Sequence, residues 1–235
     1  LALNSLGTWT VEQSTDAPTG FSNSFKATCT TADASPATGD YVVIVHRMEA
    51  QNLQHLKYGT SEAESLVISF YVKSNKTGSA SFGVQQNDNG NNQFTKAYTI
   101  NSPNVWEHKK ITIPGDTAGV IDNDNGIGLI IDFWLNSGST YTGGSHNAAW
   151  EVATQPNRNA DNLGVGGAVD DYFAITGVQL ELGSNDKFTP FEHRSFGDDL
   201  AICQRYFCKS SSQGVFATAG ANHATTGMFD AGTLN

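Results

Sequence analysis

The side chains best suited to chemistry in this sequence are aromatic rings that lie near amide groups. A sugar site needs flat aromatic surfaces beside hydrogen-bonding groups on an exposed face. Strict alternation along their segments places Tyr71 and Trp134 outward, while Tyr141 and Trp150 lie in a long loop. Polar partners stand together at Gln85, Gln86 and Asn87. The pattern predicts a glycan-binding site, with the alternative that the loop or another subunit covers Tyr71 and Trp134.

Catalytic motifs are absent from the sequence, which has no G-x-S-x-G elbow, no H-E-x-x-H zinc motif and no P-loop. Paired carboxylates would indicate glycoside hydrolysis, but that mechanism depends on their separation, which a sequence does not supply. Most acidic residues of an acidic protein are solvated, so we expect no enzyme, and a polysaccharide depolymerase is the last of three alternatives. The candidate acids lie in or near expected strands: Asp132, Glu151, Asp170, Asp171 and Glu181.

A calcium site is the one cofactor that the sequence suggests. The loop from Asp122 to Gly126 reads DNDNG, which brings Asp122 and Asp124 together as hard oxygen ligands. No glutamate stands at the closing position of an EF-hand, and the alternative is an Asx-rich turn that needs no ion. The six histidines are scattered singly, which offers no zinc site. The sequence therefore suggests a structural calcium ion and no other cofactor.

Charge and composition exclude several classes of function. The net charge of -10 and the pI of about 4.8 disfavour nucleic acid and anionic membrane as partners. No apolar run approaches the ~20 residues of a membrane-spanning helix, and no signal peptide is visible. The three cysteines, Cys29, Cys203 and Cys208, cannot all pair, so we expect reduced, buried thiols. Because the chain does not open with methionine, we expect its natural start to lie upstream.

Short alternating segments separated by polar turns predict an antiparallel β-sandwich. The cleanest is Leu66–Lys73, which alternates apolar and polar side chains. Ala50–Tyr58 predicts a helical turn over one end of the sandwich, and Asn136–Val169 predicts a long covering segment with one strand near Ala148–Val152. The other expected strands are Thr8–Ser14, Phe25–Thr31, Tyr41–Glu49, Ser79–Gln85, Phe94–Ile100, Trp106–Ile113, Leu129–Leu135 and Tyr172–Leu182.

The stretch from Asp170 to Lys209 combines a strand, a turn and a short helix. In the strand, a bulge at Gly177 would bring the apolar residues on both of its sides onto one core face. Pro190 then forces an extended turn, and Ser195 is placed to cap a helix whose apolar stripe includes Cys203 and whose last turn carries Arg205. Between turn and cap stand Glu192, His193 and Arg194, for which we expect structural hydrogen bonds.

This C-terminal stretch, GVQLELG followed by TPFEHR and LAICQRY, resembles a recurring segment of tail-fibre-like and other virion structural proteins of tailed, often marine, bacteriophages. The resemblance extends to QNLQHLKYG, LVISFYVKSNKT and WEHKKITIPGD, in that order, over most of residues 40–207. It implies a particle component with a jelly-roll module similar to carbohydrate-binding modules. It implies no catalytic residue.

Residues and resemblance together predict an all-β protein in three parts. Residues 1–194 form a jelly-roll β-sandwich, 195–209 a connecting helix, and 210–235 the start of a second, incomplete β-module. The expected protein lies on the surface of the virion, assembles in the cytoplasm of the host bacterium, contacts other virion proteins and forms a homo-oligomer, with a trimer favoured. It binds host cell-surface polysaccharide or, alternatively, only decorates the capsid or joins subunits.

Overall fold

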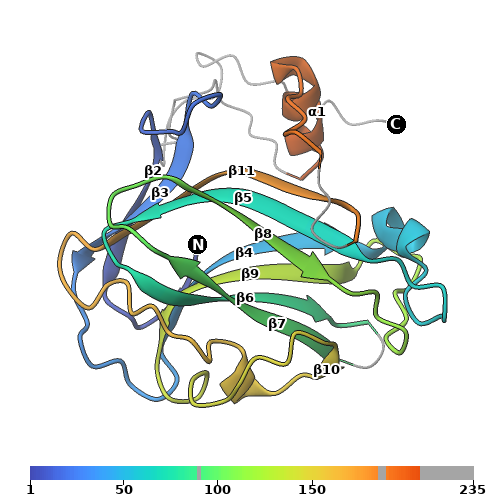
Figure 1. The fold of residues 1–235 in the computed structure, drawn as a ribbon, viewed down its shortest axis with the longest axis horizontal. Helices are drawn as coiled ribbons and strands as arrows, with labels where there is room; N and C mark the ends of the chain where they lie inside the picture. Colours follow the sequence, from blue (N-terminus) through green and yellow to red (C-terminus); the bar gives the residue numbers. More distant parts are fainter. Residues whose placement is uncertain (89–90, 185–188, 207–235) are drawn as a thin grey trace, which may run out of the picture. The chain divides into compact units, whose positions relative to one another are not determined.

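Two antiparallel β-sheets packed face to face form the body of the protein (Figure 1). The structure, a computed structural model, describes residues 1–88, 91–184 and 189–206. The six-stranded sheet has the order β1-β4-β9-β6-β7-β10 and the five-stranded sheet the order β2-β3-β11-β5-β8. The strands are β1 (Ala2–Asn4), β2 (Thr8–Ser14), β3 (Ser24–Thr31), β4 (Tyr41–Glu49), β5 (Leu66–Ser74), β6 (Gly78–Gln86), β7 (Asn92–Ile100), β8 (Glu107–Ile113), β9 (Ile127–Ser137), β10 (Glu151–Val152) and β11 (Tyr172–Leu182). The predicted fold, an antiparallel jelly-roll sandwich with a short C-terminal helix, is confirmed.

The core lies between the sheets and is built by alternation. In β5, Ile68, Phe70 and Val72 are fully buried against β9, where Phe133 packs edge-on to Phe70 at 5.0 Å between ring centroids. Each fully buried side chain of this kind stabilises the fold by about 1.5–3 kcal/mol before chain entropy is subtracted. The intervening residues of each strand point outward, so the sequence pattern decides which side chains the two outer faces can offer.

Two local features complete the sandwich. The 3₁₀ helix η1 (Ala50–Leu56) buries Ala50, Leu53 and Leu56, as the expected helical turn requires. In β11 the pairing with β5 shifts by one residue between Thr176 and Gln179, and Gly177 has a φ of 58°. That bulge aligns Phe173 and Ile175 with Leu180 on the inner face, because the extra residue restores the alternation. Val178 and Leu182, which were also expected on the core face, are 44% and 52% exposed. The missed strand β1 has only three residues and no alternation to reveal it.

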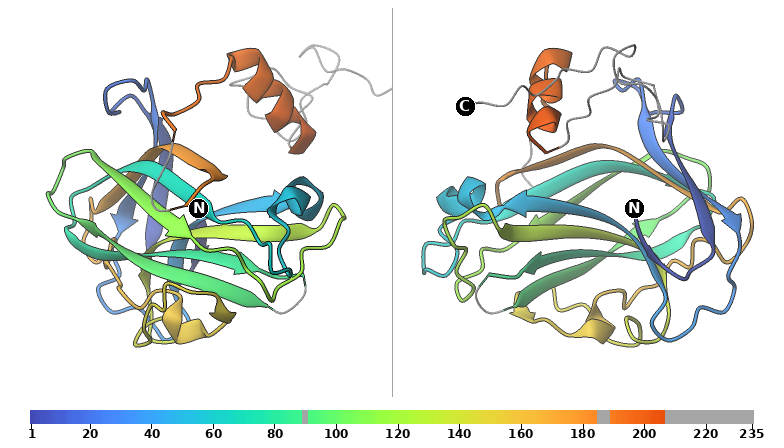
Figure 2. Two further views of the ribbon diagram at one scale, coloured as in Figure 1. Left: turned by 45° about the vertical axis from the view of Figure 1, so that its right-hand side comes forward. Right: turned by 180° about the vertical axis from the view of Figure 1, so that it is seen from behind.

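The long segment between β9 and β11 covers part of the outer face of the six-stranded sheet. In Figures 1 and 2 it runs along the side of that sheet that faces away from the five-stranded one. It contributes β10, which pairs with β7, and η2 (Gln155–Asn157). Ser81 of β6 donates to the Asp161 carbonyl at 3.1 Å, and the Ala148 N–H donates to the Thr95 carbonyl at 3.2 Å. The expected covering segment and its short strand are therefore present.

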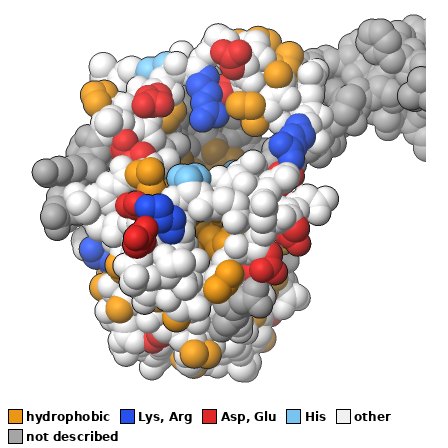
Figure 3. All heavy atoms as spheres, turned by 90° about the vertical axis from the view of Figure 1, so that its right-hand side faces the viewer, with side chains coloured by type: hydrophobic (Ala, Val, Ile, Leu, Met, Phe, Trp, Pro, Cys, Tyr) orange, Lys and Arg blue, Asp and Glu red, His pale blue; other side chains and the backbone are white. Residues whose placement is uncertain are grey.

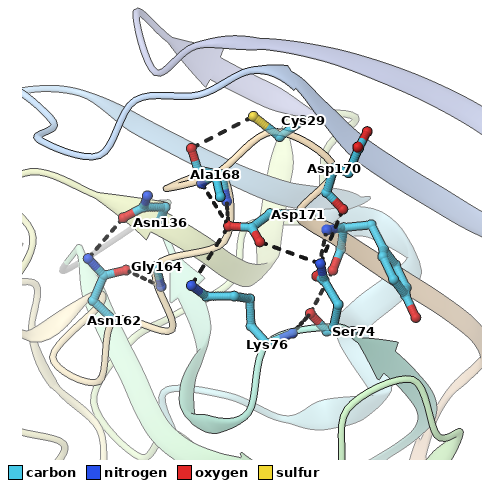
Figure 4. A network of polar contacts seen from close by, with 12 residues as sticks. Cys29, Ser74, Lys76, Asn136, Asn162, Gly164, Ala168, Asp170 and Asp171 are labelled. Carbon is cyan, nitrogen blue, oxygen red and sulfur yellow. Dashed lines mark hydrogen bonds and ion pairs between the residues drawn. The ribbon is translucent and has the colours of Figure 1, made fainter.

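The turn that leads from this segment into β11 is held by Asp171 (Figure 4). Its carboxylate accepts the N–H groups of Gly166 at 3.1 Å and Ala168 at 3.0 Å, and lies 3.8 Å from Lys76 Nζ. Cys29 packs beside this turn, and its thiol donates to the Gly166 carbonyl at 3.7 Å. A buried carboxylate needs such partners, so Asp171 is used for structure.

A second compact unit begins at Glu192 and is described as far as Tyr206. Its helix α1 (Phe196–Tyr206) is capped by Ser195, whose Oγ accepts the Asp198 N–H at 3.2 Å and donates to the Asp198 carboxylate at 2.7 Å. Residues 207–209 of the expected helix and the expected second module at 210–235 lie outside the described residues. Within the described part of the chain, none of the helices combines the length and the apolar character that crossing a bilayer requires.

One expectation for helix α1 is wrong, because its thiol is not buried, whereas Leu200 of the expected apolar stripe is half-buried and Phe207 lies outside the described residues. Cys203 is exposed, Phe196 is 74% exposed and Ile202 is 48% exposed. Helical spacing shows which face could be buried, but it does not supply the surface that buries it. The neighbouring side chains Pro190, Glu192, His193, Arg194 and Arg205 are likewise exposed.

Candidate functional site

A groove of about 270 Å³ lies on the outer face of the six-stranded sheet. Its floor comes from outward side chains of β4, β9 and β6, and one wall comes from Tyr141 and Arg158 of the covering segment. The strands fix the floor because every second residue of each points to this face. The floor and rim are formed by Ala2, Tyr41, Val43, Val45, Arg47, Gln85, Asn87, Ile130, Asp132 and Trp134.

Three aromatic side chains meet at one end of the groove. Tyr141 lies against Trp134 with ring centroids 5.2 Å apart, and Tyr41 packs edge-on to Tyr141 at 5.5 Å. Trp134 is only 3% exposed, whereas Tyr41 and Tyr141 are half-buried. The exposed ring surface at this end therefore belongs to the two tyrosines, with Trp134 supporting them from below. Sequence reasoning missed Tyr41, although it begins the outward alternation of β4.

A chain of polar groups crosses the floor. The Gln85 amide donates to the Asp132 carboxylate and accepts a hydrogen bond from the Arg158 guanidinium. Arg158 also donates to Gln155 Oε1 at 3.1 Å and lies over the Trp134 ring, 5.8 Å from its centroid. Arg158 was not predicted, because it comes from an irregular segment in which no periodicity indicates direction.

The carboxyl group of Asp132 is electrostatically unusual. The residue is 4% exposed. Burial raises its pKa, while Arg158, the Gln85 amide and Arg47 lower it, and the net result is a pKa of about 6. Burial disfavours the charged form of a carboxyl group, and the partners offset only part of that cost. Among the described residues that line the groove, Asp132 is the sole carboxylate, so the second acid of a hydrolytic pair is missing there.

Several buried polar atoms on this face have no hydrogen-bond partner among the described residues. On the sheet itself these are Trp134 Nε1, Gln93 Oε1 and Thr95 Oγ1, and in the covering segment His146 Nδ1 and Asn159 Oδ1. An unpaired buried polar group costs roughly 1–3 kcal/mol. The covering segment thus closes over the sheet without satisfying all of its polar groups.

Tyr71 lies on the other outer face of the sandwich. It belongs to β5 of the five-stranded sheet, stacks on His108 at 4.5 Å and contacts Phe21 at 5.4 Å. Tyr71 and Trp134 both point outward from their sheets, as alternation requires, but the sheets face in opposite directions. The structure therefore does not bring these two predicted site residues together.

Trp150 also lies outside the groove. Its indole N–H donates to the Pro114 carbonyl at 2.6 Å, and its ring packs edge-on to Tyr58 at 5.7 Å. It lines a hollow of about 460 Å³ together with Glu151. Glu151 accepts hydrogen bonds from Gln93 at 3.0 Å, from Asn157 at 2.8 Å and from Asn147. Both residues are engaged in holding the covering segment.

Of the remaining predicted residues, some line the groove and others lie elsewhere in the structure. Asn87 is exposed and lines the groove, as Gln85 does. Gln86 is fully buried on the inner side, where its amide donates to the Val120 carbonyl. Of the other acids, Asp170 and Asp171 form the turn before β11, and Glu181 accepts the Thr189 N–H at 2.8 Å and its hydroxyl at 2.7 Å.

In the predicted calcium loop, carboxylate oxygens accept hydrogen bonds from backbone N–H groups. Asp124 Oδ1 accepts the Gly126 N–H at 2.8 Å, and the Asp122 N–H donates to Asp88 Oδ2 at 3.0 Å. In residues 1–88, 91–184 and 189–206, no three histidine, cysteine or acidic side chains gather as a metal site would require. Calcium at Asp122 and Asp124 stays a prediction.

The protein is thus an antiparallel β-sandwich that carries a groove lined by aromatic and polar side chains on one outer face. No protein-family model matches the chain, and a search of curated proteins found no match. Among solved structures, 77% of this chain is similar to 19% of the bacteriophage CBA120 tailspike protein 4 enzymatically active domain, with a TM-score of 0.42 and 14% identity.

The chain is also similar to two carbohydrate-binding modules. For the family 11 module of a Clostridium thermocellum cellulosomal cellulase, the TM-score is 0.40 with 16% identity over 78% of this chain and 86% of that one. For the xylan-binding CBM22-2 domain from Paenibacillus barcinonensis, the TM-score is 0.38 with 13% identity over 75% of this chain and 89% of that one.

Proposed function

We propose that this chain is a non-catalytic glycan-binding module of a bacteriophage particle, and that its ligand lies in the groove over β4, β9 and β6. The observation that carries the proposal is the composition of that groove. Half-buried tyrosine rings, Tyr41 and Tyr141, stand beside a carboxylate, amides and guanidinium groups. Apolar rings with a few convergent polar groups are the arrangement by which proteins hold small polar ligands.

Each part of the groove has a role in this proposal. The tyrosine rings contact the apolar faces of sugar rings, and the exposed Asn87 amide exchanges hydrogen bonds with hydroxyl groups. The buried Gln85, itself bonded to Asp132, positions Arg158 beside the ligand. Asp132 has no neighbouring acid in the groove, which supports binding over hydrolysis. Unlike the predicted site, the proposed one does not use Tyr71, Trp150 or Gln86.

The place on a virion rests on the sequence resemblance to tail-fibre-like proteins. In this proposal the ligand is a polysaccharide of the host surface, and the module contacts other virion proteins. Immunogold labelling of intact particles would test the location. Absence of label from purified particles would contradict it.

Glycan binding is tested by array screening followed by calorimetry of the strongest ligand. Tyr141→Ala and Tyr41→Ala should each weaken binding about tenfold or more, since losing a ring contact in a polar ligand site costs on the order of 1–2 kcal/mol. Tyr71→Ala is the matched control, because it removes the same type of side chain from the opposite face. Equal loss in all three variants, or no binding by the wild type, would reject the proposed groove.

A purely structural role is the second candidate, favoured by helix α1. Its exposed Phe196 and Ile202 could be covered in a homo-oligomer, for which a trimer remains the prediction. Sedimentation equilibrium of the wild type and of Phe196→Ser would test this. A protein that forms trimers through Phe196 and binds no glycan would favour subunit joining as the function.

A further inference from the structure

The groove has a charge that differs from that of the chain around it. The sequence contains 23 acidic residues against 13 lysines and arginines. On the end of the molecule drawn in Figure 3, acidic and basic side chains are scattered among uncharged ones, without one large patch of a single sign. Two of the four arginines of the chain, Arg47 and Arg158, nevertheless line this one groove.

Neither arginine forms a direct hydrogen bond or ion pair with a carboxylate of the described residues, although both lie close enough to Asp132 to lower its pKa. Arg47 pairs with Ile130 through the β4 backbone, but its exposed side chain forms no hydrogen bond or ion pair with another described residue. Arg158 donates to two amide oxygens, of Gln85 and Gln155, and forms no ion pair within 4.0 Å with any residue that the structure describes. Arginines that stabilise a fold through charge usually meet an acid directly. Here both guanidinium groups keep donors for another partner.

Asp132, the acid on the floor, does not neutralise the groove. It is buried below Gln85, which takes up one carboxylate oxygen, and its pKa of about 6 leaves it partly protonated in mildly acidic solution. With Asp132 ionised, the charges of the lining residues sum to about +1, and with Asp132 protonated to about +2. The groove is cationic in either state.

We infer that the groove selects acidic glycans, whose carboxylate or sulfate group lies between Arg47 and Arg158; this inference rests on the proposed glycan-binding function. The guanidinium group is planar and offers paired N–H donors that match the oxygens of a carboxylate or a sulfate. The Arg158 guanidinium lies over the Trp134 ring, with Cζ 5.8 Å from the ring centroid, in a cation–π contact that helps to position it. Tyr41 and Tyr141 contact the sugar ring that carries the acidic group.

The test compares glycans that differ only in charge. Calorimetry would be run with oligogalacturonate against its methyl ester, and with a sulfated galactan oligomer against its desulfated form. We expect at least tenfold weaker binding after the charge is removed, and the pair that shows the difference identifies the anion as carboxylate or sulfate. Raising NaCl from about 20 mM to about 500 mM should weaken binding of the acidic form only, because salt screens exposed charges.

Arginine variants assign the effect to the groove. Arg47→Gln and Arg158→Gln should each weaken binding of the acidic oligomer about tenfold, since each removes charge-assisted hydrogen bonds to the anion. Arg158→Lys should restore part of the loss. Lys26→Gln removes one positive charge from β3 of the five-stranded sheet, away from the groove, and should change nothing. If Arg158→Gln fails to fold, Arg47→Gln still decides, because the Arg47 side chain is exposed and forms no hydrogen bond with another described residue.

Two results would overturn the inference, and they differ in meaning. Equal binding of charged and neutral forms, or unchanged binding in both arginine variants, would reject selection of acidic glycans and leave glycan binding intact. Absence of binding to every glycan tested, charged or neutral, would reject the proposed function and the inference with it.

Discussion

The two outer faces of the sandwich present aromatic and polar side chains in two different ways. On the five-stranded sheet these groups satisfy one another: Tyr71 stacks on His108, and Asp16 accepts hydrogen bonds from Lys73 at 2.7 Å and Trp106 at 3.0 Å. On the six-stranded sheet, Trp134 Nε1, Gln93 Oε1 and Thr95 Oγ1 are buried without partners. The two faces therefore differ in how completely the described residues pair their polar side chains, and the face with unpaired groups is the one that carries the groove.

The largest difference between the faces should appear on removing their central aromatic residues. Trp134→Ala should lower the free energy of unfolding by about 3–5 kcal/mol, because Trp134 is almost fully buried. Tyr71→Ala should cost about 1–2 kcal/mol, since its ring is half-exposed. Urea unfolding of both variants measures this. Equal costs would show that the covering segment does not pack on the sheet as described.

Asp132→Asn should stabilise the protein at neutral pH. Folding raises the pKa of Asp132 from 3.8 to about 6, so the folded state binds more protons than the unfolded state between those values. Stability from this group is therefore complete below about pH 4 and lost as pH rises through about 6. The variant should gain up to about 3 kcal/mol at pH 7.5 and nothing at pH 3.5. Thermal unfolding across this range checks the expected convergence.

Gly177→Ala should destabilise the five-stranded face by about 1–2 kcal/mol, because a side chain at positive φ is strained. Gly177 has a φ of 58°, and a Cβ there would lie 2.6 Å from Cζ of Phe21. Gly39→Ala is a suitable control, since Gly39 has open space around it and no positive φ. A neutral Gly177→Ala would mean that the bulge is not needed.

Glu107 should respond to pH with the opposite sign to Asp132 and with a smaller effect. Burial raises its pKa, but hydrogen bonds from Lys109, Ser102 and Asn101 outweigh burial and bring the pKa to about 2. Its contribution is therefore complete above about pH 4.5 and lost as pH falls through about 2. Glu107→Gln should cost about 1 kcal/mol at pH 7, allowing for solvent screening. Thermal unfolding at pH 7 and at pH 2.5 should show the difference shrinking.

The fold was largely predictable because alternation identifies strands and their outward residues. The strands β2, β4 and β11 have the predicted bounds, and Gly177 was located as the bulge. Alternation says nothing, however, about which sheet a strand joins. Tyr71 and Trp134 were therefore assigned to one site although they belong to different sheets.

The groove was less predictable than the fold, because alternation does not show which segments meet in space. Its strand residues Tyr41 and Arg47 follow the outward period of β4 and could have been found from it. Arg158 and the contact of Tyr141 with Trp134 depend on where an irregular segment folds back, which is decided by tertiary hydrogen bonds such as Ser81 to Asp161. No local pattern contains that information.

The covering segment supplies one wall of the groove while the strands supply the floor. It is attached to the sheet through short side chains and main-chain hydrogen bonds, such as Ala148 to Thr95. Substitutions at Tyr141 or Arg158 can thus alter recognition while the interior of the sandwich keeps its packing. Under the proposed function, a new glycan is in this way accessible through changes in a single loop, without redesign of the scaffold.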